Sequence, residues 1–121
     1  MPQIPTFIAA HMGYLWDGAR FRIIGSEVTE ANGGDSTLLV ESAVLRLRFV
    51  TDKTQLFLDL QPRAGRAKDW YSVDLVRRLF LGEREPSAVL DASYADFIGE
   101  RLDDIEARFD SERWPETQTE L

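Results

Sequence analysis

The segment 43–61 predicts a β-hairpin, and this hairpin constrains the fold more than any other part of the chain. Apolar and basic residues alternate in Leu-Arg-Leu-Arg-Phe from position 45, and leucines occupy every second position in Leu-Phe-Leu-Asp-Leu from position 56. Alternation with a period of two places every second side chain on the same face of a strand. A slip of one residue would turn the large apolar side chains outward, so they specify a buried face and a firm register.

We expect the hairpin to turn over residues 51–54, because Thr-Asp-Lys-Thr separates the two alternating runs. On the polar face, a charge pair and an arginine–aromatic contact are each worth about 0.2–1 kcal/mol. The expected facing pairs are Leu45 with Leu60, Leu47 with Leu58, Phe49 with Leu56, Arg46 with Asp59, and Arg48 with Phe57.

Two more strands are predicted before the hairpin, at 21–24 and 37–40. The Asn-Gly-Gly sequence within 30–36 predicts the turn between them, and Gly25 indicates a bulge after the first strand. At Glu41-Ser42 the apolar pattern is interrupted, so we expect a bulge or bend that keeps the apolar residues before and after it on one face. The result is a meander of about four antiparallel strands.

Two short helices are predicted on either side of these strands. The first is capped at Thr6 and ends at Gly18, and the second is capped at Ser72 and ends at Gly82. The residues that share the apolar face of the first helix are Phe7, His11, Tyr14 and Leu15.

A third helix is predicted from Ser93, which forms a variant of the capping box with Asp96. Its apolar residues fall within an arc of about 80°. Regular structure is expected to end at Trp114-Pro115, with residues 116–121 as a frayed tail. The apolar residues of this helix are Tyr94, Ile98, Leu102, Ile105 and Phe109.

The order of these elements predicts an α+β fold, with an antiparallel meander sheet of about four strands and helices packed on one face. A chain of 121 residues has the length of one domain, which we assign to residues 1–115.

The negative charge of the chain is concentrated at its C-terminal end. The formal net charge is -7, and residues 91–121 carry 3 basic and 10 acidic side chains, so the first 90 residues balance to zero. On the last helix the acidic residues lie opposite the apolar stripe. They form either a surface that binds a basic partner or the solvent face of an amphipathic helix. The acidic residues predicted to bind a partner are Asp96, Glu100, Asp103, Asp104 and Asp110.

No motif in the sequence predicts catalysis. The chain has no Cys and only one His, and it contains no phosphate-binding loop, nucleophile elbow or zinc-helix pattern. We therefore expect a non-enzymatic protein without a cofactor or a metal. The alternative is a small-ligand-binding or enzymatic domain whose pocket lies between sheet and helices and contains His11, Trp70 and Tyr71.

Basic residues gather in the segment after the hairpin. Arg63, Arg66 and Lys68 precede Trp70-Tyr71, a combination that fits either an anion or single-stranded base, or solvated cations above a packed Trp and Tyr. The acidic net charge argues against nucleic acid as a general partner. Because there is no long apolar segment and no signal peptide, we expect a cytoplasmic protein that does not span a membrane.

The hairpin sequence from Leu45 to Asp52, the run from Leu56 to Leu60, Trp70-Tyr71 and the acidic C-terminal helix together resemble small, uncharacterised bacterial proteins. Some of these are grouped with immunity proteins of contact-dependent or polymorphic toxin systems. The resemblance covers about residues 37–110 and implies a non-enzymatic cytosolic inhibitor that binds a toxin domain. It carries over no binding residue and does not imply the activity of the toxin.

The sequence therefore predicts a protein-binding module that binds a basic partner through the acidic face of its last helix, and the resemblance implies that this partner is a toxin domain. A homodimer formed through the outer face of the sheet or through an exposed strand edge is a further expected mode of association.

Overall fold

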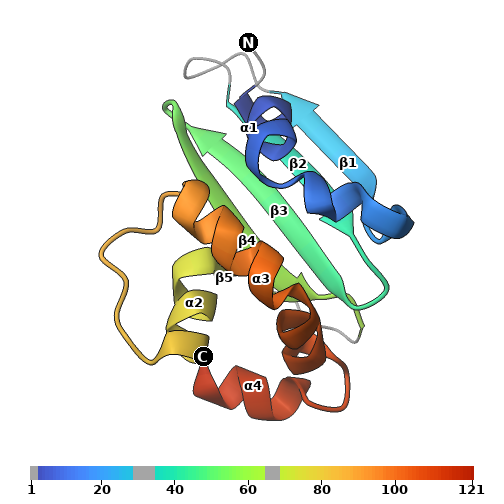
Figure 1. Ribbon diagram of the computed structural model, residues 1–121, viewed down its shortest axis with the longest axis vertical. Helices are drawn as coiled ribbons and strands as arrows, with labels where there is room; N and C mark the ends of the chain where they lie inside the picture. Colours follow the sequence, from blue (N-terminus) through green and yellow to red (C-terminus); the bar gives the residue numbers. More distant parts are fainter. Residues whose placement is uncertain (1–2, 29–34, 65–68) are drawn as a thin grey trace.

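In the computed structural model, which describes residues 3–28, 35–64 and 69–121, five strands form one antiparallel sheet in the order β1-β2-β3-β4-β5. The helices lie on one side of this sheet (Figure 1). The predicted α+β meander is confirmed, with a short fifth strand added at its end. The elements are α1 (Gln3–His11), the 3-10 helix η1 (Gly13–Ala19), β1 (Arg22–Val28), β2 (Ser36–Glu41), β3 (Leu45–Asp52), β4 (Gln55–Pro62), β5 (Tyr71–Ser72), α2 (Val73–Leu81), α3 (Ala92–Phe109) and α4 (Trp114–Glu120).

The β3–β4 hairpin has the predicted faces, but the predicted register is wrong by two residues. Lys53 and Thr54 form a two-residue turn with φ values of 50° and 70°. Such turns match the twist of the flanking strands better than the four-residue turn that we expected over 51–54. A shift of two residues keeps each side chain on its face, so the leucines are still buried. The observed facing pairs are Asp52 with Gln55, Phe49 with Leu58, Arg48 with Asp59, Leu47 with Leu60, Arg46 with Gln61 and Leu45 with Pro62.

At Ser42 the chain reverses direction between β2 and β3, so the predicted break is a turn between two strands. The Ser42 side-chain oxygen accepts hydrogen bonds from the backbone N–H groups of Val44 at 3.2 Å and Leu45 at 3.0 Å. A bulge does occur where Gly25 indicated one, because the register of β1 against β2 shifts between Ile23 and Gly25.

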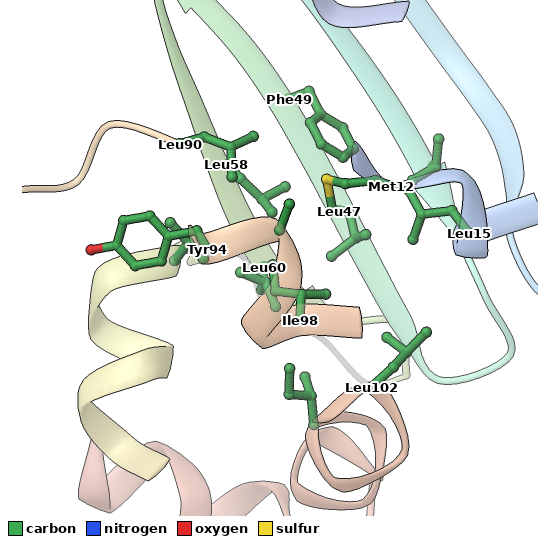
Figure 2. Packing of buried hydrophobic residues seen from close by; sticks show 14 of the residues in the cluster. Met12, Leu15, Leu47, Phe49, Leu58, Leu60, Leu90, Tyr94, Ile98 and Leu102 are labelled. Atoms are coloured by element: carbon green, nitrogen blue, oxygen red, sulfur yellow. The ribbon is translucent and has the colours of Figure 1, made fainter. Parts of the chain in front are cut away.

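The hydrophobic core lies between the inner face of the sheet and the helices. Figure 2 shows Met12 from the segment after α1, and Ile98 from α3, pointing toward the leucines of β3 and β4. Leu47 and Leu58 are fully buried there. Burying each such side chain is worth about 1.5–3 kcal/mol.

The N-terminal helix begins earlier than predicted and buries a different face. Pro5 lies in the first turn of α1, where its missing N–H costs no intrahelical hydrogen bond, so the helix starts at Gln3 and not at Thr6. Phe7 is only partly buried and His11 is exposed. The buried residues of this segment are Ile4, Ile8, Met12 and Leu15.

All five apolar residues predicted for α3 are buried, and Ala95 and Phe97 join them. The capping residue is Asp91 and not Ser93, because Oδ1 of Asp91 accepts a hydrogen bond from the N–H of Tyr94 at 3.0 Å. The predicted stripe is correct because the 3.6-residue period does not depend on which residue caps the helix.

The C-terminal segment is more regular than predicted, because Trp114-Pro115 begins α4 instead of ending regular structure. Proline is well tolerated in the first turn of a helix. Thr117 is fully buried, and its hydroxyl donates a hydrogen bond to the carbonyl of Arg108 at 2.6 Å. Residues 116–120, which we expected to fray, are therefore attached to α3.

Tyr14 connects η1 to α3 through a close approach at Gly99. The Tyr14 hydroxyl donates a hydrogen bond to the carbonyl of Ala95 at 2.6 Å. A Cβ at position 99 would lie 2.7 Å from the Tyr14 ring. The absence of a side chain at Gly99 therefore allows η1 to lie directly on the helix.

We predict that Gly99→Ala destabilises the protein by about 1–3 kcal/mol, because the added methyl group displaces a ring held by its hydroxyl. In a helix with free space at this position, the same change would raise the free energy of unfolding by about 1 kcal/mol. The sign of the measured change therefore shows whether Gly99 is closely packed. Urea unfolding measures the effect. Gly13→Ala is the control, since a Cβ there meets no atom within 4 Å. Equal stability of wild type and Gly99→Ala would contradict the close packing.

Glu41 is a buried carboxylate at the end of β2, with a side chain only 7% exposed. Among the described residues, three arginines approach it: Arg22 at 2.9 Å, Arg46 at 3.2 Å and Arg63 at 3.6 Å. Hydrogen bonds from Arg22 and then from Arg46 lower the pKa of Glu41 below its usual value. The charged carboxylate therefore stabilises the folded state above the pKa of the unfolded chain, and this stabilisation is lost as the pH falls through the folded pKa.

We predict that Glu41→Gln lowers the free energy of unfolding at pH 7 by about 1–2 kcal/mol, because hydrogen bonds to a charged group are replaced by weaker ones. The difference from wild type should begin to shrink as the pH falls below the pKa of the unfolded carboxyl, about 4.3, and should disappear once the pH is below the lowered pKa of folded Glu41, where the wild-type carboxyl is protonated in both states. Denaturant unfolding at several pH values measures this, with the exposed Glu83→Gln as the control. A difference that does not change with pH would contradict the role of the charge.

Candidate functional site

The acidic residues of α3 lie on the side of the helix that faces away from the core. Asp96, Glu100, Asp103 and Asp104 are all exposed, and the Asp103 side chain is 91% exposed. We call these four residues the α3 acidic surface. The buried stripe on the opposite side fixes the rotation of the helix. Non-helical backbone angles at Arg101 mark a kink, so Asp96 and Glu100 lie before the kink and Asp103 and Asp104 lie after it.

The predicted residue Asp110 has a different role. It is partly buried and ends α3, and its side chain accepts a hydrogen bond from the N–H of Glu112 at 3.0 Å. This bond shapes the turn into α4. Asp110 is therefore explained by local structure and is not part of the α3 acidic surface.

A hollow of about 180 Å³ separates η1 from the α3 acidic surface, and Asp17 lies on its η1 side. Sequence reasoning did not place Asp17 with the α3 residues, because no helical or strand period connects positions 17 and 100. Only the packing of Tyr14 on α3 brings them to one hollow. The residues that line it are Tyr14, Asp17, Arg20, Gly99, Glu100, Leu102 and Asp103.

Arg20 forms ion pairs with two acidic residues of α3, one partly buried and one exposed. Its guanidinium donates hydrogen bonds to Glu106 and, at 2.7 Å, to Asp103. The other Glu106 carboxylate oxygen accepts a hydrogen bond from the Ser42 hydroxyl at 2.5 Å. Glu106 is therefore used to attach α3 to η1 and to the β2–β3 turn, whereas Asp103 keeps most of its surface in solvent.

The Tyr14 hydroxyl at the hollow is not an acid–base group at neutral pH. Burial, and secondarily the Asp96 carboxylate, raises the pKa of Tyr14 well above its usual range. The phenol stays protonated and donates its hydrogen bond to Ala95.

The three residues of the alternative pocket each contact a different side chain. His11 is exposed and stacks on Phe7, with ring centroids 4.9 Å apart. The guanidinium carbon of Arg48 lies 4.4 Å from the centroid of the Trp70 ring. The ring centroids of Tyr71 and Trp114 are 5.5 Å apart. Each of these side chains thus has its own packing partner.

The basic residues near Trp70 are only partly described. Arg66 and Lys68 lie outside the described residues. Arg63 donates a hydrogen bond to the Ser42 carbonyl at 3.3 Å. Arg77, on α2, has a guanidinium nitrogen 3.5 Å from a carboxylate oxygen of Glu85, and its guanidinium lies over the Tyr94 ring. Its charge is therefore paired with residues of the same chain.

Two larger hollows border α2, with volumes of about 320 and 430 Å³. Arg78 lines both of them, beside Asp74 and Glu85 in the first and beside Arg108 and Glu120 in the second. In the described part of the chain, no three His, Asp or Glu side chains are placed to hold a metal ion. None of the helices described there has the length and apolar character needed to cross a membrane.

We compared the chain with known proteins in three ways. No protein-family model, no curated protein and no solved structure matches it.

We predict that Arg20→Met destabilises the protein by about 1–2 kcal/mol, because the partly buried Glu106 loses its charged donor. Asp103→Asn, which removes the other partner of Arg20, should cost less than about 0.5 kcal/mol, since that carboxylate is solvated. Thermal and denaturant unfolding measure both variants. Equal losses for the two would show that the ion pair with Glu106 does not anchor α3.

Proposed function

We propose that this chain is a non-enzymatic protein-binding module that binds a basic protein through the α3 acidic surface. The observation that carries the proposal is the arrangement of Asp96, Glu100, Asp103 and Asp104 on the exposed side of a helix whose other side is locked into the core. The helix backbone that carries these carboxylates is already ordered before a partner arrives, so little backbone entropy is lost on binding.

The main effect of such a surface on binding comes from its charge. Several carboxylates of one sign raise the rate of encounter with a cationic protein and penalise acidic competitors. Asp17 adds a further acidic side chain across the hollow, and within this hollow Arg20 is the basic residue that offsets part of the charge. The surface therefore has a negative excess in a chain that is itself acidic.

Trp16 is an exposed apolar residue next to Asp17 in the chain. It precedes Asp17 in η1, and it is 40% exposed although tryptophan usually buries most of its surface. Exposed tryptophan is enriched among the residues that dominate protein–protein binding energy. A partner with basic residues around an apolar depression fits this combination.

The partner class that we propose is a basic toxin domain, neutralised in the cytoplasm. The acidic surface described above supports a basic partner, and the toxin as the partner class comes from the resemblance that we expect, from the sequence alone, for residues 37–110. Binding, without any reaction, is sufficient for this function.

To test the proposal, the triple variant Asp96→Asn, Glu100→Gln, Asp104→Asn is compared with wild type for binding to the partner captured from native lysate. Each exposed charge is worth about 0.2–1 kcal/mol, so we expect the three substitutions together to lower the affinity by about 3- to 150-fold. The association rate of wild type should also fall as salt is added. Calorimetry and surface-binding kinetics measure these effects.

The matched control neutralises three exposed acidic residues elsewhere: Asp52→Asn, Glu83→Gln and Glu116→Gln. It changes the net charge by the same amount and should leave the affinity near that of wild type. If both triple variants are folded and bind the partner as tightly as wild type does, the α3 acidic surface is ruled out as the binding site.

A further inference from the structure

Strand β1 is an edge of the sheet with exposed apolar side chains. In the described part of the chain it pairs with β2 alone, and Figure 1 shows it at the border of the sheet. Ile23 is 58% exposed and Ile24 is 43% exposed. Of the four exposed large hydrophobic residues among those described, two therefore lie next to each other on this edge. An edge strand of seven residues with such side chains is a template for pairing with another strand.

The bulge in β1 brings two opposite charges to the same face of the sheet. Arg22 lies opposite Glu41 and Glu27 lies opposite Thr37. Glu41 and Thr37 are four residues apart in β2, so they share the outer face, and so do Arg22 and Glu27. Without the extra residue at Ile24, positions 22 and 27 would point to opposite faces.

This arrangement makes β1 self-complementary in one antiparallel register. Residues that face each other across two strands must lie on the same side of the sheet. A register with Arg22 opposite the partner's Glu27 and Ile23 opposite the partner's Ser26 meets this condition, and a register shifted by one residue does not. The two-fold axis repeats the Arg22–Glu27 pair, so the interface has two charge pairs.

The charges around Glu41 favour the same register. Arg22, Arg46 and Arg63 surround the single carboxylate of Glu41, which leaves two positive charges in excess within this cluster. The Arg22 side chain is 69% exposed and has donors left over. The partner's Glu27 would bring a second carboxylate to the cluster.

A hollow beside β1 can accept an apolar side chain of the second copy. It has a volume of about 200 Å³ and is lined by Gly25, Ser26, Glu27, Thr37 and Leu39. Gly25 has no side chain to cover Leu39, its neighbour on β2. In the register described, the partner's Ile24 lies opposite Gly25, at this hollow.

We propose that two copies of this chain pair through β1 in an antiparallel, two-fold symmetric manner, with Arg22 of each copy facing Glu27 of the other. The sheet then continues from one copy into the next. This surface is separate from the α3 acidic surface, and its test does not depend on the proposed toxin partner.

The register can be tested by disulfide formation, because the chain has no Cys of its own. Directly opposed residues in antiparallel strands have Cα atoms about 4.5–5.5 Å apart, within the range of a disulfide. An equal mixture of Ile23→Cys and Ser26→Cys chains should therefore form a covalent dimer under mild oxidation. Each variant alone should form much less, since position 23 faces position 26 and not itself.

Light scattering over a concentration series tests the dimer without any crosslink. Wild type should show a concentration-dependent mass between one and two chains, and Glu27→Arg should raise the dissociation constant about tenfold, because both charge pairs become repulsive. Glu83→Arg is the control with the same charge change. Ile24→Lys, which keeps all four charged partners, should also weaken the dimer.

Two results would overturn the proposal. One is a monomeric mass for wild type at every concentration, up to the millimolar range. The other is crosslinking in the Ile23→Cys sample or the Ser26→Cys sample alone to the same extent as in their mixture, since this would exclude the register.

Discussion

The burial of the inner face of β3 and β4 beneath α1 and α3 is the interaction on which the rest of the structure depends. Leu47 and Leu58 on the sheet, and Ile98 and Ile105 on α3, are completely removed from solvent. This packing fixes the rotation of α3 about its own axis. The acidic residues on the other side of α3 are therefore directed into solvent as a consequence of where the apolar residues go, and no separate interaction is needed to present them.

Charge is separated between the two layers of the molecule. The outer face of the sheet carries arginines around one buried carboxylate at Glu41, while the helical layer carries the α3 acidic surface. Arg20 connects the layers electrostatically, because it neutralises Glu106 at the point where α3 meets the β2–β3 turn. The molecule thus has two separate charged surfaces, an acidic one on α3 and a cluster of arginines around Glu41 on the sheet, and we propose a different partner for each.

Much of the fold was predictable from periodicity. The alternation in 45–60 and the helical stripe of α3 identified the correct faces, and both sets of residues are buried. Features that depend on single turns were predicted less well. The predicted hairpin register was wrong by two residues, because the chain turns over two residues, Lys53 and Thr54, and not over four. Helix α4 was missed because proline, which disrupts the interior of a helix, is tolerated in its first turn, where Pro115 lies.

By itself, the sequence determined which side of each strand and helix is apolar, because that information lies in residues two to four positions apart. Only the tertiary structure decided which acidic residues remain available. Arg20 and Glu106 are 86 positions apart and pair only because η1 lies on α3 at Gly99. The same holds for the pairing of Glu41 with Arg22 and for the shared face of Arg22 and Glu27, since a bulge acquires its geometry only when a neighbouring strand is in register beside it.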